Sequence, residues 1–225
     1  MRLADATWRD ADRAYRRLLV VPLGSLEQHG PHLPMDTDLR IAAAVAERAC
    51  AGRPGVGLAP GVPIGASGEH AGFPGTLSVG TEALTAYLVE LGRHASGDWP
   101  ALLLVNGHGG NAPAIRSAVE RLTYEGRRAH AWHAALPGAD AHAGRAETSL
   151  MLALAPESVR LDVAEPGTTA PIADLMPTLR AEGVRAVSAN GVLGDPLAAT
   201  AEEGHRLLAT LTTGLSTRLG TLLGA

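Results

Sequence analysis

Histidine and carboxylate residues gather after three short apolar runs of this 225-residue chain. The runs are 18–24 (LLVVPLG), 101–105 (ALLLV) and 129–136, and the second leads directly into NGHGGN at 106–111. The polar side chains that follow them are Glu27, His29, His32, Asp36, Asp38, His108, Asp140, His142 and Glu147.

Imidazole and carboxylate groups are the ligands that Zn, Mn and Fe(II) prefer. A pair of metal ions needs about five or six donor groups, one of them a bridging carboxylate. Two of the candidates, Glu27 and His29, are two positions apart and point the same way in an extended segment. A set that could hold two metal ions without any cysteine is Glu27, His29, Asp38, His108 and Glu147.

Each of these residues also has a simpler interpretation. A single loop histidine is usually solvated or hydrogen-bonded, and Asp36 or Asp38 can cap the helix that follows them. The NGHGGN turn fits an anion-binding loop as well as a metal site, because backbone N–H groups at a helix start bind phosphate. It lacks the GxGxxG spacing of a dinucleotide fingerprint. The residues alone leave open a metal-dependent enzyme and a phosphate- or nucleotide-binding module, which metal content would distinguish.

The elements that must position these side chains are strands alternating with helices. Strands are predicted at 18–24, 56–63, 101–105 and 129–136. Helices are predicted from Asp38 to about 49, from a Thr81 cap to 95, after NGHGGN through Leu122, and at 147–154, 171–183 and from Thr200 onward. This alternation predicts one α/β domain over 1–225 with a mostly parallel sheet. In such sheets ligands bind beyond the carboxyl ends of the strands, so the polar clusters share one rim.

Composition excludes several classes of protein. Apolar residues make up 46% of the chain, which is enough for a packed core, and the net charge of −4 argues against a nucleic-acid or anionic-membrane surface. All 19 basic residues are arginine, which excludes a Schiff-base or P-loop lysine. The single cysteine, Cys50, the charged start of the chain and the lack of a long apolar run favour a cytoplasmic protein.

Four segments resemble the creatininase family of metal-dependent amidohydrolases: 21–38 (VPLGSLEQHGPHLPMDTD), 67–78 (SGEHAGFPGTLS), 106–111 (NGHGGN) and 142–149 (HAGRAETS). The resemblance implies a three-layer α/β/α fold, a homo-oligomer and two divalent ions, Zn, Fe(II) or Mn. It implies that Glu27, Asp38 and His108 hold one ion. His29 and Asp38 hold the other, so that Asp38 bridges them. His142 matches the histidine that acts on the substrate amide.

The chain departs from creatininase at two points. Gly110 stands where creatininase has a carboxylate ligand, and Glu147 is the candidate to replace it. The tryptophans near the substrate are also missing, since position 138 is glycine and only Trp132 is close by, which makes creatinine a poor candidate substrate.

The segments 140–149 (DAHAGRAETS) and 191–200 (GVLGDPLAAT) resemble one branch of the family. That branch releases a C-terminal Val-Tyr dipeptide from a small, decarboxylated and cross-linked precursor peptide. Another amidohydrolase of the family, acting on a cyclic amide or a formamide, is the alternative. The loop residues Glu69, His70 and Ser78 are candidates for one wall of the pocket, or for simple turn chemistry.

Overall fold

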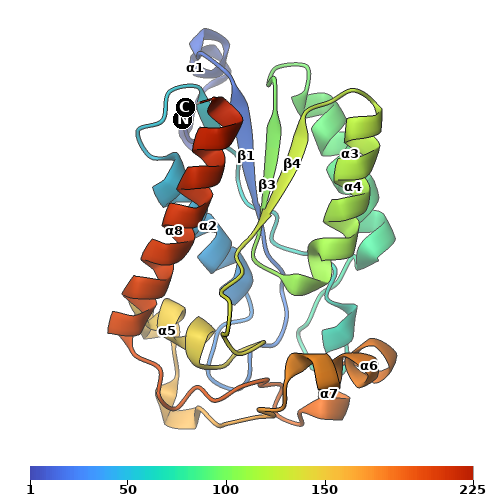
Figure 1. Cartoon of the computed structure of the whole chain (residues 1–225), viewed down its shortest axis with the longest axis vertical. Helices are drawn as coiled ribbons and strands as arrows, with labels where there is room; N and C mark the ends of the chain where they lie inside the picture. Colours follow the sequence, from blue (N-terminus) through green and yellow to red (C-terminus); the bar gives the residue numbers. More distant parts are fainter. Residues whose placement is uncertain (225) are drawn as a thin grey trace.

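A four-stranded parallel sheet forms the centre of the molecule, whose computed structural model describes residues 1–224 (Figure 1). The strands are β1 (Leu18–Leu23), β2 (Val56–Leu58), β3 (Leu102–Asn106) and β4 (Ala129–His133), in the spatial order β2-β1-β3-β4. All four predicted strands are confirmed. The second and the fourth are shorter than predicted and end at Leu58 and His133. After the second, Pro60 and Pro63 have no N–H to donate to a neighbouring strand.

Helices follow the strands along most of the chain. They are α1 (Trp8–Arg13), α2 (Thr37–Cys50), α3 (Gly80–Ala95), α4 (Ala112–Tyr124), α5 (Arg145–Leu154), α6 (Ile172–Glu182), α7 (Val184–Val187) and α8 (Ala201–Leu223). The last helix was predicted from about Thr200 onward; α8 begins at Ala201, and Thr200 caps it, with its side chain accepting from the N–H of Glu203. The prediction of a Thr81 cap is wrong, because α3 begins at Gly80 and Thr81 already lies inside it.

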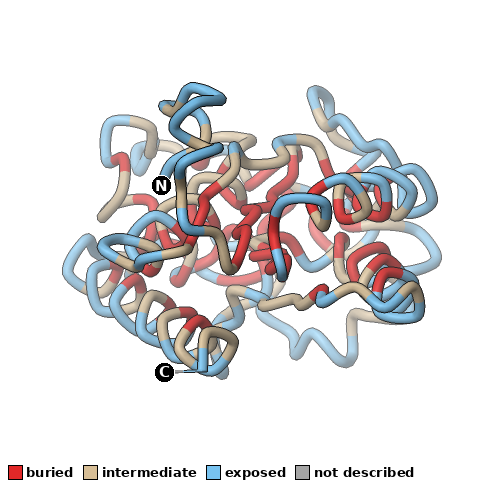
Figure 2. Tube along the Cα trace, turned by 90° about the horizontal axis from the view of Figure 1, so that it is seen from above, coloured by how far each residue is buried: buried red, intermediate tan, exposed pale blue. Residues whose placement is uncertain are grey.

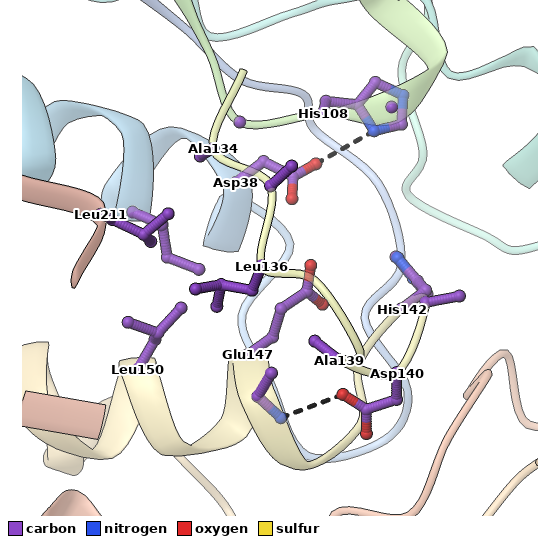
Figure 3. Close-up of a pocket in the computed structure, with 16 residues that line it drawn as sticks. Asp38, His108, Ala134, Leu136, Ala139, Asp140, His142, Glu147, Leu150 and Leu211 are labelled. Atoms are coloured by element: carbon purple, nitrogen blue, oxygen red, sulfur yellow. Dashed lines mark hydrogen bonds and ion pairs between the residues drawn. The ribbon is translucent and has the colours of Figure 1, made fainter. Parts of the chain in front are cut away.

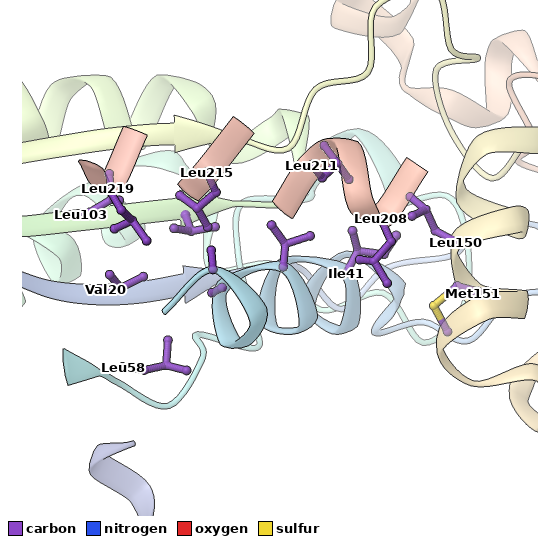
Figure 4. Close-up of a cluster of buried hydrophobic side chains, with 14 of the residues drawn as sticks. Val20, Ile41, Leu58, Leu103, Leu150, Met151, Leu208, Leu211, Leu215 and Leu219 are labelled. Atoms are coloured by element: carbon purple, nitrogen blue, oxygen red, sulfur yellow. The ribbon is translucent and has the colours of Figure 1, made fainter. Parts of the chain in front are cut away.

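The helices cover both faces of the sheet, which confirms the predicted three-layer α/β/α arrangement. Successive strand residues point to opposite faces, so Val20 and Leu103 pack with α2, α5 and α8, while Val21 and Leu104 pack with α3 and α4. Figure 4 shows the first of these two clusters, and Figure 2 shows the buried interior surrounded by exposed helix faces. Among residues 1–224, no helix combines the length and apolar character that crossing a membrane requires.

The strand order determines where a ligand can bind. The chain leaves β1 towards β2 on one side and returns to β3 on the other, so the strand connections diverge between β1 and β3. In open α/β sheets this divergence opens a crevice at the carboxyl ends of the strands. The loops that follow β1, β3 and β4 meet at that edge, and they carry the predicted site residues.

Candidate metal centre

The structure brings the five predicted ligands and His142 together at this edge of the sheet. Three groups of side chains have ligand atoms within 4.8 Å of one another: Glu27 with Asp38 and His108, His29 with Asp38 and Glu147, and Glu27 with His29 and His142. Asp38 belongs to two of these groups. Its Oδ1 lies 3.2 Å from Nε2 of His29, and its Oδ2 lies 3.2 Å from Nδ1 of His108. One carboxylate therefore faces two imidazoles, one through each oxygen.

Local hydrogen bonds hold these side chains in place. The Nδ1 of His29 lies 3.1 Å from the main-chain oxygen of Glu27, so an N–H there leaves Nε2 facing Asp38. Asp38 lies in the first turn of α2, where the hydroxyl of Ser25 donates to Oδ2. Its carboxylate therefore faces the site and does not cap the helix. Glu147 lies in the first turn of α5, with Oε2 4.0 Å from Nε2 of His29.

The surroundings of the Glu27 carboxylate indicate whether this group of residues can bind a cation. Its side chain is completely buried, yet neither oxygen has a hydrogen-bond partner among the described residues. Imidazole nitrogens of His108 and His70 lie 3.2 Å away without hydrogen-bond alignment. A buried, unpartnered carboxylate is costly unless a cation neutralises it. The surrounding nitrogen and oxygen donors suit divalent Zn, Mn or Fe, so this set of residues fits such ions.

Negative charge is crowded in the centre. Burial alone would lower the pKa of His29, but the carboxylates of Asp38, Glu147 and Glu27 outweigh it and raise that pKa to about 10. Burial raises the pKa of Glu147 to about 7, and Asp38 and Glu27 add to the rise while His29 opposes it. Three carboxylates therefore lie close together at this site, where positive charge stabilises them.

His142 faces the same centre as a neutral imidazole. Burial, followed by the neighbouring His29 and His70, lowers its pKa to about 3. Its Nε2 lies 2.8 Å from the main-chain oxygen of Gln28, which an N–H at that position satisfies. Nδ1 then carries no proton and lies 3.9 Å from Oε1 of Glu27. This free nitrogen can accept or return a proton at the centre of the site.

The segment 191–194 holds the backbone around His142 through hydrogen bonds. The N–H of Leu193 donates to the main-chain oxygen of His142 at 2.8 Å, and the N–H of Ala141 donates to the oxygen of Leu193 at 3.0 Å. Gly194 lies against the carboxylate of Asp140. The motif GVLG thus holds the loop after β4 in its place at the edge of the sheet.

Gln28 is a site residue that the sequence analysis missed. Its Oε1 accepts from the N–H of Gly30 at 2.8 Å, while Nε2 lies 3.1 Å from the oxygen of Gly191 and 2.9 Å from Nδ1 of His70. The contacts with Gly30 and Gly191 fix the orientation of the side-chain amide, with Oε1 towards the N–H of Gly30 and Nε2 towards the oxygen of Gly191. The Nε2 of His70 lies 3.2 Å from Oε1 of Glu27. His70 was predicted either to form part of one wall of the pocket or to serve as a turn residue. Its adjacency to Gln28 is visible only in three dimensions.

Other polar residues predicted near the site have structural contacts. Asp140 accepts from the N–H groups of Arg145 and Ala146 and caps α5. His32 pairs with the hydroxyl of Thr148, and Ser78 accepts from two loop N–H groups as a turn residue.

The position of Gly110, where creatininase has a carboxylate, is closely surrounded. A Cβ there would lie 2.3 Å from Oε1 of Glu69 and 2.4 Å from Nε2 of His108. A larger residue at position 110 would therefore displace its neighbours. Glu147 faces His29 and Asp38 from the opposite side, where it could replace that carboxylate.

A cavity of about 280 Å³ opens beside these residues (Figure 3). Asp38, His108, His142 and Glu147 line it, together with apolar residues of α2, α5, α8 and the loop after β4.

Comparisons with known proteins identify the family of the chain. The family model for creatininase, described as creatinine amidohydrolase, matches residues 4–219. The mycofactocin precursor peptide peptidase of Mycolicibacterium smegmatis is 53% identical over 208 residues, which cover 90% of this chain and 84% of that protein. Creatininase solved in a manganese form has a TM-score of 0.79 and 27% identity, covering 98% and 97% of the two chains. A creatininase variant in a Zn–Zn form has a TM-score of 0.80 and 28% identity, with the same coverage. The chain thus belongs to the creatininase family, and it is a metal-dependent hydrolase that cuts carbon–nitrogen bonds.

Proposed function

We propose that the chain binds two divalent metal ions and releases the C-terminal Val-Tyr dipeptide from a modified mycofactocin precursor peptide. The observation that carries the metal proposal is the pairing of Asp38 with both His29 and His108 beside the unpartnered carboxylate of Glu27. Glu27, Asp38 and His108 would hold one ion, and His29, Asp38 and Glu147 the other. Zn and Mn are supported by the metal forms in which creatininase has been solved, and Fe(II) suits the same donors.

The reaction divides between the ions and the protein. Two divalent ions would polarise the scissile carbonyl and lower the pKa of the attacking water towards about 7. The chain's own contribution is to orient the amide and move protons. His142 would take a proton on Nδ1 and return it to the leaving nitrogen. The Nε2–H of the ring remains anchored on the main-chain oxygen of Gln28, so the ring keeps its orientation while Nδ1 changes protonation.

The substrate proposal follows from the relatives. The protein from M. smegmatis is named a peptidase of the mycofactocin precursor, and it is 53% identical to this chain along most of its length. In the present site, the loop after β4 contributes small side chains to the lining of the cavity, with alanines on either side of Asp140. We further propose that the protein acts in the cytoplasm, which fractionation of cells that produce it would test, and that it is a homo-oligomer, which sedimentation of the purified protein would test.

Two other functions are less well supported. A phosphate-binding module would use the N–H groups of NGHGGN, but this loop turns His108 towards the carboxylates of Glu27 and Asp38, which repel a phosphate. An amidohydrolase for a cyclic amide or a formamide would use the same ions and His142. It differs in substrate only.

The test of the proposed function is hydrolysis of a cross-linked precursor peptide that ends in Val-Tyr. The metal-depleted protein should be inactive, and activity should return as metal is added, saturating near two equivalents per chain. Mass spectrometry should find the released dipeptide portion. Turnover of a cyclic amide with no cleavage of the peptide would contradict the substrate proposal, and activity that survives complete metal removal would contradict the metal proposal.

A further inference from the structure

The cavity beside the candidate metal centre has two chemically different ends. Its polar end consists of Asp38, His108, His142 and Glu147. Its other end is apolar, and Figure 3 shows the side chains of Leu136, Leu150 and Leu211 gathered on the side away from His142. The predicted chemistry uses the polar end, so the apolar end has no role in it.

The apolar end is built on rigid elements. It is formed by Ile41 of α2, Leu150 of α5 and Leu211 of α8, which are 5%, 2% and 3% exposed. Leu136, from the loop after β4, is half-buried and forms the remaining wall. Helical side chains packed in the core keep one rotamer, so the shape of this wall is predefined.

The four side chains of the apolar end, Ile41, Leu136, Leu150 and Leu211, carry no charge and no polar atom. The carboxylate of Asp140, which also lines the cavity, is engaged by the N–H groups at the start of α5. An apolar group would bury surface against the leucines at little cost, whereas a charged group there would lose its hydration without gaining a partner.

We infer that this apolar end binds the side chain of the first residue of the released fragment, and that Leu136 contributes to the preference for a branched aliphatic side chain there. The inference rests on the proposed function. In that function His142 hands a proton to the leaving nitrogen, which belongs to this residue, and His142 lines the same cavity. The volume of about 280 Å³ lies just below the range of roughly 300–1,000 Å³ typical of small-molecule pockets, so it admits one or two residues.

The test compares peptides that end in Val-Tyr, Ala-Tyr and Asp-Tyr. One missing methylene in an apolar pocket changes kcat/KM by about 10–200-fold, so the valine peptide should exceed the alanine peptide by at least ~10-fold. The aspartate peptide should be the poorest substrate. Leu136→Ala should reduce the ratio of valine to alanine to below ~10-fold. Leu161→Ala, a matched change at a residue 51% exposed and outside the cavity, should keep the wild-type ratio.

Binding of the free dipeptides to the metal-loaded protein, measured by calorimetry, gives a readout that does not depend on turnover. Val-Tyr should bind at least ~10-fold more tightly than Ala-Tyr, and Leu136→Ala should narrow this difference. Equal kcat/KM and equal affinity for the valine and alanine compounds would overturn the inference and leave the proposed function intact. Failure to cut any of these peptides or the cross-linked precursor would instead overturn the proposed function, and dipeptide binding would then decide the inference alone.

Discussion

Replacing Gly191 by alanine should damage the site without touching a proposed metal ligand. Gly191 has a φ of +83°, a conformation that L residues with a side chain rarely adopt. A Cβ at this position would lie 1.9 Å from Oε1 of Gln28. The amide of Gln28 cannot swing away freely, because it contacts the N–H of Gly30, the oxygen of Gly191 and Nδ1 of His70.

Two costs add in this variant. Left-handed backbone costs a residue with a Cβ about 1–2 kcal/mol, and overpacking a filled interior costs about 1–3 kcal/mol. Gly191→Ala should therefore lower the free energy of unfolding by roughly 2–5 kcal/mol. Gly126→Ala is the matched control, since Gly126 has a φ of +78° but a Cβ at this position would have nothing within 4 Å. It should incur only the backbone cost, and any stiffening of the unfolded chain is common to both variants.

The assay is denaturant unfolding of the two variants and the wild type, followed by steady-state kinetics. Gly191→Ala should be less stable than Gly126→Ala by about 1–3 kcal/mol, and its kcat/KM should fall by about 10²-fold because the groups around Glu27 are displaced. Gly126→Ala should keep wild-type kinetics. Gly126 lies in the turn before β4, at the amino ends of the strands, whereas the site lies at their carboxyl ends. Equal stability and equal kinetics for the two variants would refute the proposed contact between Gly191 and Gln28.

Three further predictions concern single side chains. Glu147→Gln should lose mainly one of the two metal ions and keep the fold, which metal analysis and circular dichroism would check; unchanged metal content would remove Glu147 from the ligand set. His142→Ala should keep both ions while kcat falls by about 10²–10⁴-fold with little change in KM, and loss of an ion would make His142 a ligand. Hydrogen bonds from Arg93, then from Arg121 and Arg127, lower the pKa of Glu125 from its ordinary 4.5 to about 2. This carboxylate therefore stabilises the fold above pH 4.5, and the contribution disappears as the pH falls towards 2. Unfolding measured against pH should show a shallower acid decline for Glu125→Gln, and identical curves would contradict the assignment.

The position of the site was predictable because it depends on the order of strands and loops. Apolar runs such as 101–105 are long enough to identify buried strands, and parallel strands place the loops that follow them at one edge. His29 and Asp38, which follow β1, could thus be predicted to meet His108, which follows β3. The short helix α1 was missed because its six residues carry no apolar periodicity and none of them is buried.

The details of the site depend on contacts between segments far apart in the chain. Gln28 contacts His70 and Gly191, and no spacing along the sequence indicates that these three residues adjoin. Asp140, by contrast, is close to His142 in sequence and was a candidate ligand, yet its carboxylate caps the start of α5. Carboxylates that bind a metal and carboxylates that accept backbone N–H groups have the same residue type, so only geometry separates them.

Metal analysis of Asp38→Ala tests the central claim most directly, because one oxygen of Asp38 lies 3.2 Å from His29 and the other lies 3.2 Å from His108. Asp36→Ala is the control, since the carboxylate of Asp36 pairs with Arg40 and lies outside the three candidate ligand groups. We predict close to two divalent ions per chain in the wild type and in Asp36→Ala, and loss of both ions in folded Asp38→Ala. Retention of two ions by Asp38→Ala at wild-type affinity would contradict the bridging role and the two-metal centre built on it.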